Sequence, residues 1–309
     1  MDGISNKIRE LIEPHGYKAK TVSITHLPEV QESVAKLIRQ GLINKQLSEK
    51  WHFYLNTNEN LPDAKTIIVV AMPQPFTRLR FECQGKIFPA DIPPTYFTKM
   101  DDSRAERIFK SVLELTGYRI VKAHLALKTL AVRSGLAEYG RNNISYVREM
   151  GSFFWLIAFY SDAPCEIDDW QELKAMKACD NCILCLENCP TESITADRFL
   201  IHAEKCLGFI NEKEPDIPYW VKLQPDWTNA LIGCMCCQSV CPANKSYLQN
   251  IKNGPSFSEE ETVKILNKIS WEQLPTGIRK KLEDVRGVYP LLAGNLGALI
   301  EKQKKMTQG

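Results

Sequence analysis

Apolar residues recur at helical spacing in several stretches of the first ~170 residues. Residues 4–12 and 28–42 each carry an apolar stripe, and residues 101–115 and 125–136 have a helical pattern that stops near a glycine. Residues 66–71 and 153–160 are instead short continuous apolar runs, which is typical of buried strands. The pattern predicts a mixed domain of helices and strands, and it leaves the strand order open.

The pattern changes twice later in the chain. Periodicity is weak from Pro73 to Pro94, which favours a long loop of the kind that is functional or mobile. After Ser246 the chain becomes polar and helical, through residues 259–268 and 290–305. We therefore expect three parts: a mixed α/β domain over 1–172, a cysteine-rich domain over 173–250 and a short helical segment over 251–309.

Composition and charge narrow the class of protein. Apolar residues make up 44% of the 309 residues and the net charge is +2, so a folded core is expected and nucleic acid is not required by charge. The basic runs 279–281 and 302–305 are expected on solvated helix faces. No export signal is visible, and the longest apolar run is far shorter than the roughly 20 residues of a membrane span. We expect a cytoplasmic protein with no membrane partner.

Eight of the eleven cysteines form two spaced motifs with one cysteine between them. The first is C-x2-C-x2-C-x3-C-P, and the second is C-x2-C-x3-C-P. Closely spaced thiolates can wrap three corners of one 4Fe–4S cube, while the cysteine before proline reaches the neighbouring cube. The predicted ligands of cluster one are Cys179, Cys182, Cys185 and Cys241, and those of cluster two are Cys189, Cys206, Cys234 and Cys237.

Zinc and disulfides are the alternatives for this many cysteines. Structural zinc sites prefer two C-x2-C pairs across a longer loop, often with histidine, and only His202 lies in this region. A cytoplasmic setting disfavours disulfides. Cys83, Cys165 and Cys236 are left over. Cys236 could compete with Cys237 as a ligand, but the x3 spacing to Cys241 favours Cys237.

The stretch Lys128-Thr-Leu-Ala-Val-Arg-Ser-Gly-Leu-Ala-Glu-Tyr-Gly-Arg-Asn142, the pair Gly151-Ser152 and the cluster region with its extra Cys206 resemble epoxyqueuosine reductases. The resemblance runs from about Ile67 to Asn244. That family is related to reductive dehalogenases and binds cobalamin beside its two clusters. The resemblance implies an α+β fold: a nitroreductase-like or corrinoid-reductase-like α/β domain, a ferredoxin-like two-cluster domain and a short helical tail.

The resemblance also implies site residues. The family has a Tyr-x4-Asp element whose aspartate donates a proton, and Tyr96 and Asp101 match its spacing. Asp101 is therefore the candidate general acid and Tyr96 a candidate cofactor contact. The plain alternative is that Asp101 only starts a helix. Arg133, Arg141 and Asn142 lie in the matching stretch and are candidate corrin or substrate contacts, with helix surface as the alternative.

The expected function is an iron–sulfur reductase that takes electrons from an external low-potential donor and passes them to cobalamin. Residues 135–142 and the Asp102-Ser103 pair depart from the family pattern, and only 68 residues follow Cys241, where the family continues into a tRNA-holding module. A small molecule or a corrinoid partner is thus favoured over tRNA as substrate. The alternatives are a cluster-only electron-transfer protein and a shortened tRNA epoxyqueuosine reductase.

Overall fold

The computed structural model describes residues 4–43, 58–94, 105–111, 115, 117–213, 221 and 224–306. The chain forms two compact units. The first unit contains Met1–Gln74, Lys99–Ile183 and Asp197–Leu200, and the second contains Pro75–Thr98, Leu184–Ala196 and Ile201–Gly309. The sequence-predicted three-part division at 172 and 250 stays a prediction; the two units divide the chain at other places.

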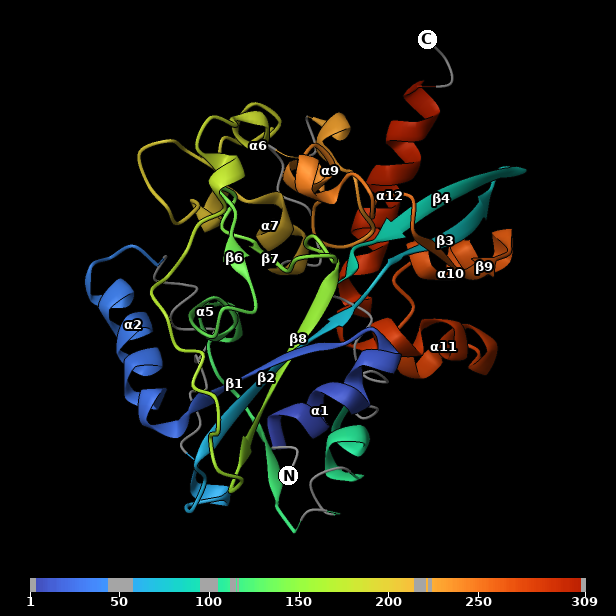
Figure 1. Ribbon diagram of the computed structural model, residues 1–309. Coiled ribbons are helices and arrows are strands. Elements are labelled where there is room, and N and C mark those ends of the chain that lie inside the picture. Colours follow the sequence, from blue (N-terminus) through green and yellow to red (C-terminus); the bar gives the residue numbers. More distant parts are fainter. Residues whose placement is uncertain are drawn as a thin grey trace. The chain divides into compact units, whose positions relative to one another are not determined.

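The first unit is built on a four-stranded sheet with the order β1-β2-β8-β5, in which every neighbouring pair is antiparallel (Figure 1). The central strands are the two apolar runs seen in the sequence, and both predictions of buried strands are confirmed. The strands are β1 (Lys18–Ser23), β2 (Thr66–Pro73), β5 (Ile120–Ala123) and β8 (Phe154–Ser161).

Both faces of this sheet are covered by helices, which explains why its central strands β2 and β8 are nearly continuous apolar runs. On one face, Ile67 and Val69 of β2 pack in a core with α2 (Leu27–Arg39) and α5 (Leu127–Arg133). On the other, Ile68 and Val70 pack with α1 (Ile4–Ile12) and helical residues 105–111. The predicted helices near 4–12, 28–42 and 125–136 are confirmed.

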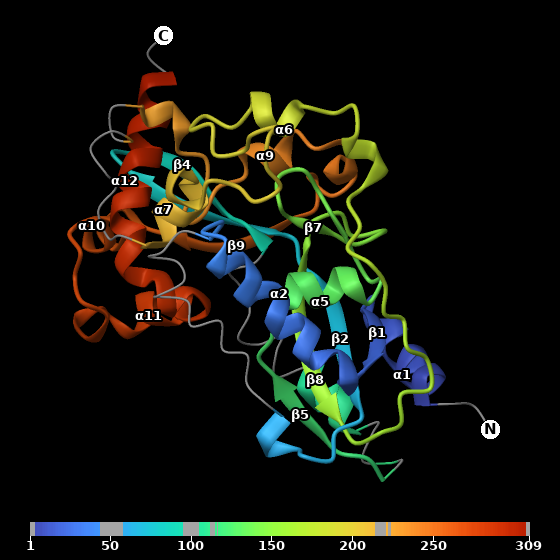
Figure 2. The same ribbon diagram turned by 90° about the vertical axis from the view of Figure 1, so that its left-hand side faces the viewer.

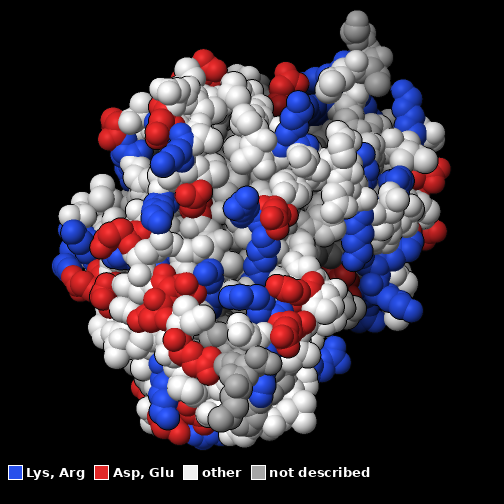
Figure 3. All heavy atoms as spheres, in the orientation of Figure 1, with Lys and Arg blue, Asp and Glu red and all other residues white. Residues whose placement is uncertain are grey.

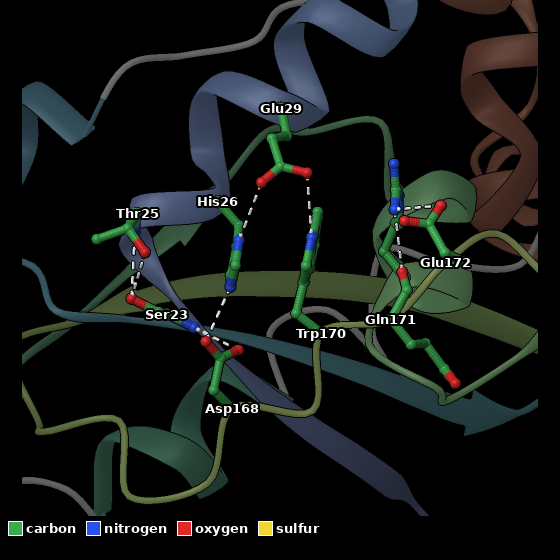
Figure 4. A network of polar contacts seen from close by, with 9 residues as sticks. Ser23, Thr25, His26, Glu29, Asp168, Trp170, Gln171 and Glu172 are labelled. Carbon is green, nitrogen blue, oxygen red and sulfur yellow. Dashed lines mark hydrogen bonds and ion pairs between the residues drawn. The ribbon is translucent and has the colours of Figure 1, made fainter.

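A strap of residues 168–174 leaves the sheet and runs along α2 and α5 (Figure 4). His26 lies flat on Trp170, with ring centroids 4.3 Å apart, and its Nε2 lies 2.8 Å from Asp168 Oδ2. Trp170 Nε1 donates to Glu29 Oε2 at 3.2 Å, and contacts with His26 and Trp170 lower the pKa of Glu29. The strap is thereby anchored just before the first cysteine motif.

The second unit contains a three-stranded sheet with the order β4-β3-β9. The expectation of a long loop from Pro73 to Pro94 is wrong, because β3 (Phe76–Cys83) and β4 (Lys86–Ile92) form an antiparallel hairpin. Gln84 and Gly85 both have positive φ, 53° and 68°, as a two-residue hairpin turn requires. The strands bury Leu79, Phe81 and Phe88 on one side of the sheet. Apolar residues therefore do alternate with polar ones along these strands, with a period of two.

Strand β9 (Ile251–Phe257) also lies in a stretch where the sequence indicates only polar helix. It pairs in parallel with β3, and its register shifts between Arg78 and Arg80. A side chain on Gly254 would come within 2.9 Å of Thr77 Cγ2, so glycine permits this close pairing. The ring of Phe257 stacks on Phe81 with centroids 4.7 Å apart.

Three C-terminal helices complete this unit (Figure 2). They are α10 (Glu259–Leu266), α11 (Thr276–Leu282) and α12 (Tyr289–Met306). The predicted helices near 259–268 and 290–305 are confirmed, and α12 packs on α10, α7 and β4. Residues 251–306 therefore contribute a strand and three helices to one core with β3 and β4.

The remaining elements are short and surround the cysteine motifs. They are β6 (Glu138–Tyr139), β7 (Ser145–Tyr146), α6 (Leu184–Glu187), α7 (Leu207–Lys213) and α9 (Cys236–Ser239), with 3-10 turns at Lys177–Cys179, Ala203–Lys205, Pro225–Trp227 and Pro242–Asn244. The α+β fold class is confirmed. Within the described residues, no helix has both the length and the apolar character needed to cross a bilayer.

Candidate iron–sulfur site

A tight hairpin between β6 and β7 fixes the position of Arg141. Gly140 N donates to Ile144 O at 2.8 Å, and Asn142 Nδ2 donates to Tyr146 Oη at 2.9 Å inside the turn. A side chain on Gly140 would approach the Tyr146 ring to 2.5 Å, so only glycine fits there. The backbone of Tyr139 bonds to Lys174 and Met176, which aligns this hairpin with the start of the cysteine loop.

Arg141 binds the backbone of that loop. Its guanidinium donates to Cys179 O at 2.5 Å, to Cys182 O at 3.1 Å and, more weakly, to Asp180 O at 3.4 Å. The backbone carbonyls of this loop point toward the guanidinium. The N–H groups and the cysteine side chains of the loop can therefore face the other way, where a cluster would be bound. Arg141 therefore shapes the loop that carries the first two cysteines.

The other residues predicted from the resemblance are placed as follows. Asn142 is buried and bonded to Tyr146. Arg133 lies over the Trp170 ring and donates to Gln171 O and Glu172 Oε2. Arg133, Arg141 and Asn142 thus all have partners within the protein. Their role as corrin contacts stays a prediction. Tyr96 and Asp101 lie outside the described residues.

In the second unit, three predicted ligands of cluster two lie within electrostatic reach of one another. Cys206 interacts with both Cys234 and Cys189, and burial raises the pKa of its thiol against the opposing effect of backbone N–H groups. A side chain on Gly208 would lie 3.5 Å from Cys206 Sγ and 3.8 Å from Cys234 N. These are ordinary van der Waals distances, so Gly208 lies next to both cysteines.

Hydrogen-bond donors are aimed at these sulfurs. Ser193 N and Oγ lie 3.3 and 3.1 Å from Cys189 Sγ. Burial raises the pKa of Cys189, but the bonds from Ser193 and Thr191 outweigh it, and the pKa is lowered. Asn229 Nδ2 donates to Cys234 Sγ at 3.2 Å and to Cys236 Sγ at 3.1 Å. Such donors stabilise thiolates and raise the reduction potential of a bound cluster.

Two buried asparagines tie the second motif to the C-terminal helix. Asn295 of α12 donates to Asn211 O at 3.3 Å, and Asn211 Nδ2 donates to Gly233 O at 2.9 Å, directly before Cys234. Lys302, also on α12, donates to Asp226 O and Thr228 O at 2.8 and 2.9 Å. Its positive charge lowers the pKa of Cys236, after the larger effect of the hydrogen bond from Cys234.

The cysteine region contains free thiols with hydrogen-bond donors aimed at several of their sulfurs. All eleven cysteines are described and none forms a disulfide. Among the described residues, no three His, Cys, Asp or Glu side chains converge on one point that could hold a single metal ion. A cube of four irons needs its four sulfurs spread around it rather than gathered at one centre. The N–H donors aimed at the sulfurs of Cys189 and Cys234 suit thiolates that hold such a cube.

Sequence reasoning missed Asn229, Asn211 and Lys302, because each acts through a contact that no local motif announces. From the sequence, Arg141 was expected only as a corrin or substrate contact. The signal for Asn229 was weak: an asparagine a few residues before a cysteine motif is common. Arg141 lay in a stretch already singled out, but only the folded hairpin shows that it faces the cysteine loop.

Replacing Arg141 by glutamine should lower the potential of one cluster, because it removes a positive charge beside the loop and two well-directed hydrogen bonds. We expect the ratio of reduced to oxidised cluster at a fixed potential to fall by about tenfold, or ~59 mV for one electron. Anaerobic potentiometric titration followed by EPR measures this shift. Arg148→Gln, at an exposed position, is the matched control. An unchanged potential in Arg141→Gln would rule out this role.

Comparison with known proteins places these observations in a family context. Residues 178–244 match the model of the 4Fe–4S double cluster binding domain. The epoxyqueuosine reductase of Yersinia pestis is 28% identical over 150 residues, which cover 47% of this chain and 34% of that protein. The epoxyqueuosine reductase of Leadbetterella byssophila is 33% identical over 141 residues, covering 45% of this chain and 44% of that one.

The chain thus matches less than half the length of these two curated relatives. A crystal structure of epoxyqueuosine reductase with a tRNA-Tyr epoxyqueuosine-modified tRNA stem loop superposes with a TM-score of 0.63 at 20% identity, over 96% of this chain and 82% of that one, which shows a shared fold. The resemblance expected from the sequence is therefore confirmed: residues 178–244 match a 4Fe–4S double cluster binding domain, and the chain is similar to epoxyqueuosine reductases in sequence and fold.

Proposed function

We propose that the chain is an iron–sulfur reductase with two 4Fe–4S clusters, which accepts electrons from an external low-potential donor and delivers them to a bound cobalamin. The observation that carries the proposal is the match to a double cluster domain over the residues in which Cys206 interacts electrostatically with Cys189 and Cys234. The eight proposed ligands are Cys179, Cys182, Cys185 and Cys241 for cluster one, and Cys189, Cys206, Cys234 and Cys237 for cluster two.

The protein's own groups would make cluster reduction easier. Reduction adds negative charge, and the guanidinium of Arg141 and the ammonium of Lys302 are placed to offset it. The N–H groups of Ser193 and Asn229 act in the same direction through their hydrogen bonds to sulfur. The clusters themselves supply single electrons, so a two-electron reduction needs two transfers.

Cobalamin enters this proposal through the family resemblance. The spacing of Tyr96 and Asp101 supports it, and Asp101 is the proposed general acid beside the corrin. One observation favours the second candidate, a cluster-only electron-transfer protein: Arg133, Arg141 and Asn142, proposed as corrin contacts, already use their polar groups within the protein. We keep the cytoplasm as the proposed location.

Two substrate classes follow for the reductase. A nucleoside in tRNA is supported by the shared fold with a tRNA-bound reductase, of which this chain covers 82%. A small molecule or a corrinoid partner is supported by the departures in residues 135–142. On the face drawn in Figure 3, basic and acidic side chains are interspersed at the left and bottom, while basic side chains are more frequent toward the right.

The test is anaerobic reconstitution followed by addition of cobalamin and recording of the visible spectrum. A shift of the cobalamin spectrum to the base-off form is the expected result. No binding at micromolar protein, with both clusters present, would leave only the electron-transfer candidate. Turnover of an epoxyqueuosine-containing tRNA stem loop then separates the two substrate classes, and Asp101→Asn should abolish turnover while keeping cobalamin binding.

A further inference from the structure

Cys236 is the one cysteine of the second motif that the ligand pattern does not use. It begins α9, directly before the proposed ligand Cys237 and two residues after the proposed ligand Cys234. A spare cysteine at such a position is usually a small buried apolar side chain. The structure places it differently, among the sulfurs of cluster two.

One amide nitrogen contacts both sulfurs. Asn229 Nδ2 lies 3.2 Å from Cys234 Sγ and 3.1 Å from Cys236 Sγ, and the two thiols are hydrogen-bonded to each other. Asn229 is itself held by Met235 N, which donates to its Oδ1 at 2.7 Å. Cys236 therefore faces the same donor as a proposed cluster ligand, and this donor is fixed in place.

The electrostatic neighbours of Cys236 include proposed ligands of cluster two. It interacts electrostatically with Cys237 and Cys189, two of the four proposed ligands, and with Lys302 of α12. Counting Cys206, which interacts with Cys189 and Cys234, five thiols are linked by one hydrogen bond and several electrostatic interactions. A 4Fe–4S cube has four irons, and each takes one thiolate.

The side chain of Cys236 also has room to turn. It is half-buried and lines a cavity of about 290 Å³, together with Asn188, Asn229 and Met235. A side chain packed on all sides is held in one rotamer, whereas one that borders a cavity can change its χ1 angle without displacing neighbours. The sulfur of Cys236 therefore has free volume beside it.

We propose that cluster two has five thiols for its four irons, and that either Cys236 or Cys237 can supply the last ligand. The inference rests on the proposed two-cluster function. In the exchange, the sulfur of Cys236 binds the iron and gives up its proton, while Cys237 leaves the iron and takes up a proton, so no electron is gained or lost. A protein built in this way keeps cluster two when one of the two thiols is blocked or oxidised.

The test compares iron content after anaerobic reconstitution in four variants: Cys236→Ala, Cys237→Ala, the double Cys236→Ala/Cys237→Ala and, as control, Cys182→Ala. Alanine is chosen because serine oxygen can itself bind iron. Each single variant at 236 or 237 should keep about eight irons per chain, and the double variant should fall to about four. Cys182 has no second cysteine beside it, so its replacement alone should lower the iron content.

Loss of about four irons in either single variant would overturn the inference, as would full iron content in the double variant. If an alanine variant does not fold, Cys237→Val, whose side chain fills the space and cannot bind iron, is examined by EPR. A wild-type-like four-iron signal is expected, and the signal of a three-iron cluster would contradict the exchange. Wild-type protein that lacks two clusters would instead refute the proposed function.

Discussion

Cys179→Ala should remove the first cluster or leave it as a three-iron form, and should lower any reductase activity by at least about a hundredfold. Cys179 is the first thiol of the C-x2-C-x2-C motif, and a cube that loses one of its protein ligands loses or exposes one iron. The carbonyl of Cys179 is also the closest acceptor of Arg141. Iron analysis and EPR of the anaerobically reconstituted protein measure the effect.

Cys83→Ala is the matched control for this variant. Cys83 lies at the end of β3, packs against the core of the second unit and belongs to neither motif. It should leave both clusters in place. An unchanged four-iron signal for both clusters in Cys179→Ala would exclude Cys179 as a ligand and with it the proposed grouping.

Glu212→Gln should stabilise the protein at pH 8 by about 3 kcal/mol and have little effect at pH 4. Glu212 lies on α7, and burial raises the pKa of its carboxyl from 4.5 to about 7. The folded protein therefore holds a proton that the unfolded chain has already lost between these values. Stability from this group is complete below pH 4.5 and falls as the pH rises to about 7, at ~1.4 kcal/mol per pH unit.

Glutamine keeps the shape of the neutral acid and cannot ionise, so the variant should not show this loss. Anaerobic urea unfolding at both pH values, followed by tryptophan fluorescence, gives the difference. Glu272→Gln, at an exposed position of the same unit, should change stability little at either pH. A Glu212→Gln effect that is equal at pH 4 and pH 8 would show that burial does not hold the proton on this carboxyl.

The elements of the first unit were predictable because their burial is repeated along the chain. Strand β2 is buried on both faces, so it reads as an unbroken apolar run, and α2 shows its buried side through Leu27, Val30 and Val34. The hairpin of the second unit was missed because its outer positions are Arg78, Arg80 and other polar residues, and because Pro89 lies within β4. Strand β9 contains Gly254 and Pro255, which disfavour strands, and only its pairing with β3 makes it one.

The cysteine motifs were predictable for a different reason. Ligands that wrap one cube are close in sequence, so their spacing is visible without the fold. The groups that tune the sulfurs are not local: Lys302 lies on the last helix, and Asn229 reaches Cys236 only through the turn that Met235 closes. Arg141 was noticed through the family resemblance, but its contact with the cysteine loop depends on the β6–β7 hairpin.

The central claim is that eight sulfurs of this chain hold two cubes of iron and sulfide. Metal and acid-labile sulfide analysis of protein purified without oxygen tests it most directly. About eight irons and eight sulfides per chain are predicted, with negligible zinc. One or two zinc ions per chain, or clearly fewer than eight irons after reconstitution, would contradict it.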